Sequence, residues 1–310
     1  MSHMYSPLAA AEGIYTALAT PFAKGGEIDY PALTRLMEQQ LRHGISGFVV
    51  CGTTGESPTL TREEKANLFR FVYAFAQGKN IDLMAGTGTN DTRETIELTK
   101  MAETIGYRRV LVVVPYYNKP SPAGLQQHFE AVADSCLGEL VLYNVPGRTN
   151  ISLTADTIVE LAAHPKINAI KEASGNLEFL AEIQKKLRLK NRSLQLLSGD
   201  DETYLEFIRA GGHGVISVAS HVCPTGMRSL EASHRAADRE EGDRLQKAYL
   251  SFFQDLFIEA NPGPLKWMLK QLGVCENVLR LPLVPISKIA EEKLKAVVSK
   301  FRKVSEEYVE

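Results

Sequence analysis

Lys171 is the residue of this chain best placed to act as a nucleophile. It closes a short apolar run, Ile167 to Lys171, which is typical of a buried β-strand. Side chains alternate between the two faces of a strand, so Lys171 is expected to share a face with Ile167 and Ala169. An ammonium among such neighbours loses hydration, which favours the neutral amine. A neutral amine can attack a ketone and form an imine.

A phenol and a guanidinium follow the preceding apolar run. The run Glu139 to Leu142 leads into Tyr143, and Arg148 lies five residues further on. Neighbouring strands lie ~4.8 Å apart, so the Tyr143 hydroxyl can serve Lys171 as an acid and base. Arg148 offers a planar fork that binds a carboxylate through two contacts. Taken alone, Tyr143 is more often a core residue and Arg148 a solvated loop residue.

Further hydroxyl groups follow two other apolar runs. Thr53 and Thr54 come after the run 47–51, and Tyr117 comes after the run 110–114. Thr54 and Tyr117 can extend a proton relay from Tyr143, and the donors of Thr53 and Thr54 can hold the carboxylate of a keto acid. Threonines in such loops also bond the backbone in a purely structural role. Together with Lys171, however, the set predicts a Schiff-base site for small carboxylates.

The elements that position these residues recur regularly along the chain. Eight apolar, β-branched runs start 20 to 34 residues apart, at 15–20, 47–51, 81–85, 110–114, 140–143, 167–171, 194–197 and 214–218. The stretches between them show helical periodicity, which indicates strand-helix units of a parallel sheet. Eight such units close into a (β/α)8 TIM barrel, whose active site lies at the carboxyl ends of the strands.

An open doubly wound sheet is the alternative fold. It is suggested by Gly86-Thr87-Gly88, which follows a strand and resembles part of a dinucleotide-binding loop. Asp91 stands where the third glycine of that motif belongs, so a tight strand-to-helix turn is the better interpretation.

Helices fill the remaining chain. Thr61-Arg62-Glu63-Glu64 has the form of a capping box, and a helix over 202–210 ends at Gly211-Gly212. After about residue 235 only helices are expected: one over 265–272, and a last one with an apolar stripe at Leu294, Val297, Val298, Phe301 and Val304. The predicted organisation is a lead with a cloning remnant (1–12), a catalytic barrel (13–235) and a C-terminal helical domain (236–310).

Composition excludes several classes of protein. A net charge of -2 offers no basic excess for nucleic acid or an acidic membrane surface. No apolar run approaches the roughly 20 residues that span a bilayer, and no signal peptide is evident, which favours the cytoplasm. The four cysteines form no Cys-x-x-Cys pair and the histidines show no ligand spacing. We therefore expect neither a disulfide framework nor a metal site.

Five motifs together resemble the dihydrodipicolinate synthase family, within the pyruvate-dependent class I aldolases. The resemblance runs from about residue 13 to near the C-terminus, and its discriminating positions are Tyr117 and Arg148. The motifs lie at 52–57, 115–120, 143–149, 170–173 and 212–217.

The resemblance implies condensation of pyruvate with L-aspartate 4-semialdehyde, on the route to diaminopimelate and lysine. Lys171 would form the imine, with no other cofactor, and Tyr143, Thr54 and Tyr117 would relay protons. Arg148 would bind the semialdehyde carboxylate, and Thr53, Thr54, Gly199 and Ile216 would also contact substrate. The family's usual homotetramer would insert Tyr117 into a neighbouring subunit's site, in keeping with two aromatic residues on one loop.

The family also implies an effector site for L-lysine at a subunit interface, near Ser57, Pro58, Arg62, Lys65, Asn90, Glu94 and Tyr116. Lys65 would stand close to the side-chain ammonium of the effector. Two ammonium groups ~4 Å apart repel by roughly 1 kcal/mol in water and by more at an interface. The sequence therefore predicts weak inhibition by L-lysine, or none.

Two other functions fit the same barrel. Another pyruvate aldolase, such as an N-acetylneuraminate lyase or a 2-keto-3-deoxy sugar acid aldolase, binds a polyol chain and generally lacks the arginine at position 148. A non-catalytic keto-acid sensor would have no need of Lys171 and Tyr143 together.

Overall fold

A computed structural model describes residues 8–306, so the expected cloning remnant at Met1 to Met4 lies outside the described residues. Eight parallel strands form a closed barrel, in which each strand pairs with the next and β8 pairs with β1. The predicted (β/α)8 barrel is confirmed, and the open sheet is excluded. The strands are β1 (Gly13–Ala17), β2 (Gly47–Val50), β3 (Asp82–Gly86), β4 (Arg109–Val113), β5 (Glu139–Asn144), β6 (Ile167–Glu172), β7 (Gln195–Ser198) and β8 (Gly214–Ser217).

Each predicted apolar run overlaps one strand, and the largest difference lies at β1. This strand begins at Gly13 and ends at Ala17, whereas the run was expected to continue to residue 20. Leu18 and Ala19 stay buried in the outer core after the strand has ended. The apolar run is therefore longer than the strand that it contains.

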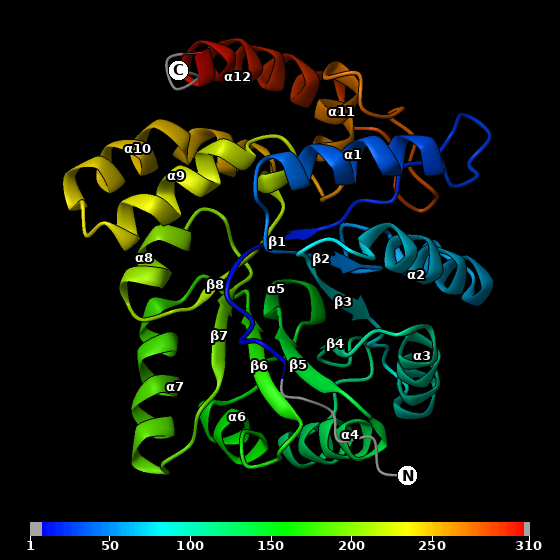
Figure 1. Cartoon of the computed structure of the whole chain (residues 1–310), viewed down its shortest axis with the longest axis vertical. Coiled ribbons are helices and arrows are strands. Elements are labelled where there is room, and N and C mark those ends of the chain that lie inside the picture. Colours follow the sequence, from blue (N-terminus) through cyan, green and yellow to red (C-terminus); the bar gives the residue numbers. More distant parts are fainter. Residues whose placement is uncertain (1–7, 307–310) are drawn as a thin grey trace.

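Helices surround the barrel, as Figure 1 shows. The capping box predicted before α2 is present: Glu64 donates its N–H to Thr61 Oγ1 (3.2 Å), and Thr61 donates its N–H to the Glu64 carboxylate (2.9 Å). The barrel helices are α1 (Tyr30–Arg42), α2 (Arg62–Ala76), α3 (Thr92–Ile105), α4 (Pro122–Ser135), α6 (Ala155–Leu161), α7 (Leu177–Leu189) and α8 (Tyr204–Arg209). Three short turns lie in loops: η1 (Ser57–Thr59), α5 (Pro146–Thr149) and η2 (Ala219–His221).

The last third of the chain is helical, as predicted. Its helices are α9 (Pro224–Arg235), α10 (Arg239–Asp255), α11 (Gly263–Gln271) and α12 (Lys288–Glu306), and they gather at the top of Figure 1. Ala290 and Leu294 of α12 are buried, which confirms the first part of the expected apolar stripe. The side chains of Val298, Phe301 and Val304 lie outside the described residues. The predicted domain boundary at 235/236 falls directly after α9 and stays a prediction.

Two apolar cores lie on the two sides of the barrel wall. The outer core fills the space between strands and helices, and includes Phe48 and Ile170. The inner core fills the barrel, and includes Met84, Ala169 and Leu197. Because strand residues alternate between these cores, Tyr143 and Lys171 continue the inner face up to the carboxyl ends of β5 and β6.

The prediction that Ile167 shares a face of β6 with Lys171 is wrong. Ile167 packs in the outer core, whereas Ala169 packs in the inner one. The pairing of β5 with β6 shifts register here, since Leu140 pairs with Ile167 but Val141 pairs with Ala169. This irregularity inserts an extra residue and reverses the face on which Ile167 would otherwise lie.

The turn after β3 is a packing feature, as interpreted from the sequence. A Cβ at Gly86 would lie 2.4 Å from the Cys51 carbonyl oxygen, and one at Gly88 would lie 2.3 Å from the Val113 nitrogen. Only glycine fits where two neighbouring strand ends approach so closely.

All four cysteines are free and buried. Within residues 8–306, no group of histidine, cysteine and acidic side chains is arranged to hold a metal ion. In that same range no helix is sufficiently long and apolar to cross a membrane.

Candidate active site

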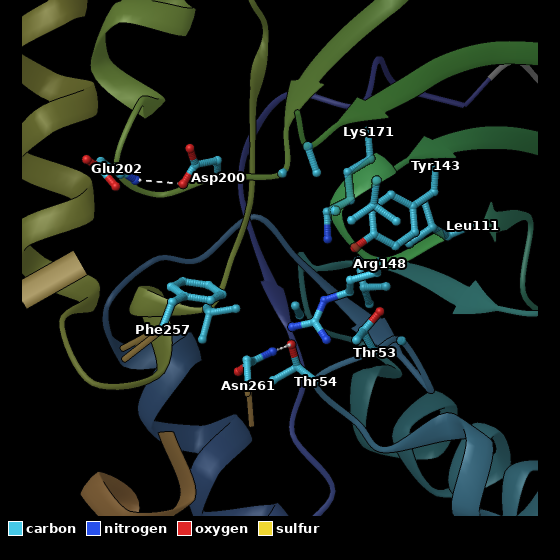
Figure 2. Close-up of a pocket in the computed structure, with 18 of the residues that line it drawn as sticks. Thr53, Thr54, Leu111, Tyr143, Arg148, Lys171, Asp200, Glu202, Phe257 and Asn261 are labelled. Carbon is cyan, nitrogen blue, oxygen red and sulfur yellow. Dashed lines mark hydrogen bonds between the residues drawn. The ribbon is translucent and has the colours of Figure 1, made fainter. Parts of the chain in front are cut away.

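A cavity of about 520 Å³ opens at the carboxyl ends of the strands (Figure 2). Most of the residues predicted for the site line it: Thr53, Thr54, Tyr143, Arg148, Lys171 and Gly199. Helix α10 and the segment that follows it complete the wall with Phe253, Gln254, Phe257 and Asn261. The barrel and the C-terminal helices therefore build the cavity together.

Lys171 and Tyr143 lie side by side at the base of the cavity. They are paired in the register of β5 and β6, and the Lys171 Nζ atom lies 4.3 Å from the centre of the Tyr143 ring. Both side chains are buried, with Lys171 only 6% exposed. The amine therefore faces the ring from within the barrel, in the place expected for a nucleophile that is shielded from bulk water.

Gly199 makes room for Lys171. A Cβ at Gly199 would lie 2.9 Å from Lys171 Cε and 2.4 Å from Ala173 Cβ. Any side chain here would push against the lysine. Ile216, also predicted to contact substrate, lies in the inner core and is not among the described residues that line the cavity. Val218, two residues later, takes that place.

Arg148 stands at the mouth of the cavity. It belongs to α5, a single turn in which its own N–H donates to the Val145 carbonyl (2.9 Å). Its side chain is exposed and points toward Thr53 and Thr54 in Figure 2. An arginine in this position can meet the carboxylate of an incoming molecule without first leaving another partner.

The loop after β2 holds Thr53 and Thr54. Thr54 is buried, and its hydroxyl oxygen accepts a hydrogen bond from Asn261 Nδ2 (2.9 Å). This contact joins residues 207 positions apart. It occupies one lone pair of the Thr54 oxygen and leaves its proton available to another acceptor. Asn261 was not among the residues predicted for the site, so its contact with Thr54 was missed.

A buried ion pair supports the same loop. Glu56 and Lys266 are both fully buried and form a salt bridge, and the other carboxylate oxygen of Glu56 accepts from the Arg280 N–H (3.0 Å). Lys266 also donates to the Val278 carbonyl (2.9 Å) and lies 4.0 Å from the centre of the Phe22 ring. Burial lowers the pKa of Lys266, and Glu56 opposes that shift. The buried cation of Lys266, from a distant segment, thus pairs with Glu56 in the loop that carries Thr54.

Tyr117 is not brought to this cavity. Its side chain is 90% exposed, and its backbone adopts a left-handed φ of 73°. The proton relay expected among Thr54, Tyr143 and Tyr117 is therefore incomplete within a single chain. The expected role of Tyr117 in a neighbouring subunit stays a prediction.

Comparisons with known proteins agree with this geometry. The model of the Dihydrodipicolinate synthetase family matches residues 10–301. The chain belongs to this family. A 4-hydroxy-tetrahydrodipicolinate synthase of Bdellovibrio bacteriovorus is 47% identical over 93% of this chain and 97% of that protein. The resemblance inferred from the motifs is confirmed.

Solved structures from the same family share the fold. Dihydrodipicolinate synthase from Aquifex aeolicus superposes with a TM-score of 0.90 at 41% identity, covering 94% of this chain and 98% of that one. The chloride-inhibited dihydrodipicolinate synthase from Acinetobacter baumannii, solved in complex with pyruvate, superposes with a TM-score of 0.88 at 37% identity, covering 93% and 98%.

A second cavity, of about 260 Å³, adjoins the first. Tyr143 and Arg148 line both cavities. Of the residues predicted for the family's effector site, Ser57, Pro58, Lys65 and Tyr116 line it, and burial raises the pKa of Tyr116. Arg62, Asn90 and Glu94 do not line it. Arg62 instead pairs with Glu97 (2.8 Å) and approaches Glu94 (3.8 Å).

Asp201 is a further residue that the motifs did not reveal. Its buried carboxylate accepts from the backbone N–H groups of Val218 (2.9 Å) and Ala219 (2.8 Å). Burial raises its pKa to about 6. Asp201 therefore ties the loop after β7 to the end of β8, and it fixes Val218 in the cavity wall.

Proposed function

We propose that this chain condenses pyruvate with L-aspartate 4-semialdehyde to 4-hydroxy-tetrahydrodipicolinate, in diaminopimelate and lysine biosynthesis in the cytoplasm. The observation that carries the proposal is the buried Lys171 amine beside Tyr143, in one cavity with Arg148. Family membership and relatives named for this reaction support it.

The first half of the reaction uses Lys171. Its amine attacks the keto carbon of pyruvate, and loss of water leaves an imine, in which the lysine nitrogen withdraws electrons. Loss of a methyl proton then gives an enamine. The Tyr143 hydroxyl, on the neighbouring strand, is the group positioned to carry these protons, with Thr54 next in the relay.

The second half uses the aldehyde. The enamine carbon attacks the aldehyde carbon, which becomes an alcohol after taking up a proton, and the imine re-forms. The amino group of the second substrate, after losing a proton, then attacks the imine carbon. A new carbon-nitrogen bond closes the ring as the bond to Lys171 breaks, and the lysine nitrogen takes up a proton. This chemistry needs no cofactor, because the covalent imine on Lys171 serves as the electron acceptor.

Substrate contacts follow from the positions of the side chains. We propose that Thr53 and Thr54 hold the pyruvate carboxylate, that Gly199 and Val218 border it in place of the predicted Ile216, and that Arg148 binds the carboxylate of the second substrate. Tyr117 completes the relay from a neighbouring subunit of a homotetramer. L-Lysine, if it binds, occupies the second cavity.

The alternatives are less well supported. A polyol-binding aldolase has no evident use for Arg148 at the cavity mouth, and a sensor has no use for a buried amine beside a tyrosine. The relatives that match nearly the whole chain carry the name of the synthase.

Borohydride trapping tests the proposal. Pyruvate with borohydride should label the peptide that contains Lys171, and Lys171→Ala should abolish labelling without loss of the fold, checked by circular dichroism. Arg148→Ala should still be labelled but should lose most aldehyde consumption. Labelling of a different lysine would exclude the mechanism.

A further inference from the structure

The proposed second substrate carries two opposite charges on one carbon atom, and Arg148 accounts for only one of them. Its α-carboxylate has a guanidinium partner, whereas its α-ammonium has none in the proposed function. Two carboxylates among the described residues line the cavity, those of Asp200 and Glu202. One of them is the natural partner for an ammonium group.

Asp200 is the better placed of the two. It follows Gly199, which lies directly against Lys171, and its side chain lines the same cavity. Figure 2 shows Asp200 between Glu202 and Lys171. Glu202 lies further out and accepts a hydrogen bond from Gln254 (2.7 Å).

The Asp200 carboxylate has capacity for another donor. One oxygen accepts from the Glu202 N–H (3.1 Å) and the other from the Thr203 hydroxyl (3.1 Å). An ionised carboxylate accepts about four hydrogen bonds, so about two positions remain. Within the described part of the chain, no lysine, arginine or histidine forms an ion pair with Asp200. Burial raises the pKa of Asp200, and a cation in the cavity would favour its ionised form.

We infer that Asp200 binds the α-ammonium group of the second substrate while Arg148 binds its α-carboxylate, so that the enzyme selects aldehydes of α-amino acids. In Figure 2 Asp200 and Arg148 lie on different sides of Lys171, and both line the cavity that would hold the substrate. The contact also keeps the substrate nitrogen close to the Lys171 imine, where ring closure needs it. This assignment rests on the proposed function.

Asp200 also organises the loop that leads into α8, and the test must separate the two roles. Asp200→Asn retains an oxygen that can accept from the Glu202 N–H and removes the charge. The substrate pair is L-aspartate 4-semialdehyde and succinate semialdehyde, which differ only by the amino group. The measurement is the rate at which pyruvate-loaded enzyme consumes one equivalent of each aldehyde.

Asp200→Asn should slow consumption of the aminated aldehyde by about 10- to 100-fold, the usual effect of a lost charge-assisted contact, and leave the other aldehyde unchanged. Asp238→Asn removes a capping aspartate from α10, away from the cavity, and should alter neither rate. Equal slowing of both aldehydes, slowing of neither, or loss of pyruvate trapping in Asp200→Asn would each overturn the assignment. If wild-type enzyme traps no pyruvate, the proposed function fails and the assignment fails with it.

Discussion

Lys65 is a single residue that can decide a regulatory property. It is half-buried and lines the second cavity together with Tyr116, where the family's effector is expected. An ammonium there would repel the side chain of L-lysine and lower its affinity tenfold or more. We expect an initial-rate titration to show no half-inhibition at submillimolar L-lysine.

The matched variant is Lys65→His, which removes the fixed charge at neutral pH and should gain sensitivity to L-lysine. Strong inhibition of the wild-type enzyme would show that Lys65 turns away from the effector. The proposed reaction would be unaffected by that result.

His221 controls part of the response to acid. Its Nε2 accepts from the Ala19 N–H (3.0 Å) and its Nδ1 donates to the Val218 carbonyl (2.8 Å), so the folded protein holds it neutral. Burial lowers its pKa to about 4. The unfolded chain binds a proton here near pH 6.5, and the folded chain does not until about pH 4. The free energy of unfolding therefore falls as pH falls between these values.

His221→Gln can keep both hydrogen bonds and cannot be protonated. Between pH 8 and pH 5, wild-type protein should lose about 2 kcal/mol more unfolding free energy than the variant, as measured by urea titration. Asp201, whose pKa is raised, contributes a pH dependence of opposite sign to the unfolding free energy. Both proteins contain Asp201, so its contribution cancels in the comparison. His234 is exposed, so His234→Gln serves as the control. Parallel pH profiles for wild type and His221→Gln would contradict the prediction.

At the scale of elements, the loop after β2 depends on charges supplied by distant segments. Lys266→Met would leave Glu56 buried without a cation, which commonly costs about 3–5 kcal/mol of unfolding free energy. The double variant Glu56→Gln/Lys266→Met removes both charges and should recover much of that loss. Urea unfolding of the wild type, the single variants and the double variant forms a complete cycle. A single variant as stable as wild type would mean that water reaches the pair.

Activity adds a second readout for the same loop. The loop carries Thr54, so we expect the double variant to fold and to condense its substrates more slowly than the wild type. Pyruvate trapping depends on Lys171 on β6 and should be affected less.

The strands show how far the sequence could specify the fold and the site. Runs buried on both faces are uniformly apolar, so all eight strands could be found, and Lys171, Tyr143 and Arg148 followed from the strand ends. The face of Ile167 could not be predicted, because it depends on the register of a neighbouring strand. Asn261 and Lys266 contact the site across 207 and 210 residues, and no local pattern encodes such contacts.

At the scale of the whole molecule, the exposure of Tyr117 predicts complementation between inactive subunits. If each site uses its own Lys171 and a partner's Tyr117, a mixed dimer of Lys171→Ala and Tyr117→Phe contains one intact site. Equal amounts of the two proteins, unfolded and refolded together, should recover about a quarter of wild-type activity, because about half of the pairs are mixed. Each variant refolded alone is the control, and no recovery in the mixture would place Tyr117 outside the relay.

The position of Asn261, Lys266 and Arg280 late in the chain has a consequence during synthesis. The last barrel strand ends at Ser217, so the barrel can close before these residues have been translated. At ~5–20 residues per second, roughly several seconds separate the two events on the ribosome. Until the later segment docks, the Thr54 loop has neither its amide nor its buried cation. A nascent chain should therefore hold a formed barrel that cannot yet turn over substrate, and the onset of activity would report the docking of its C-terminal helices.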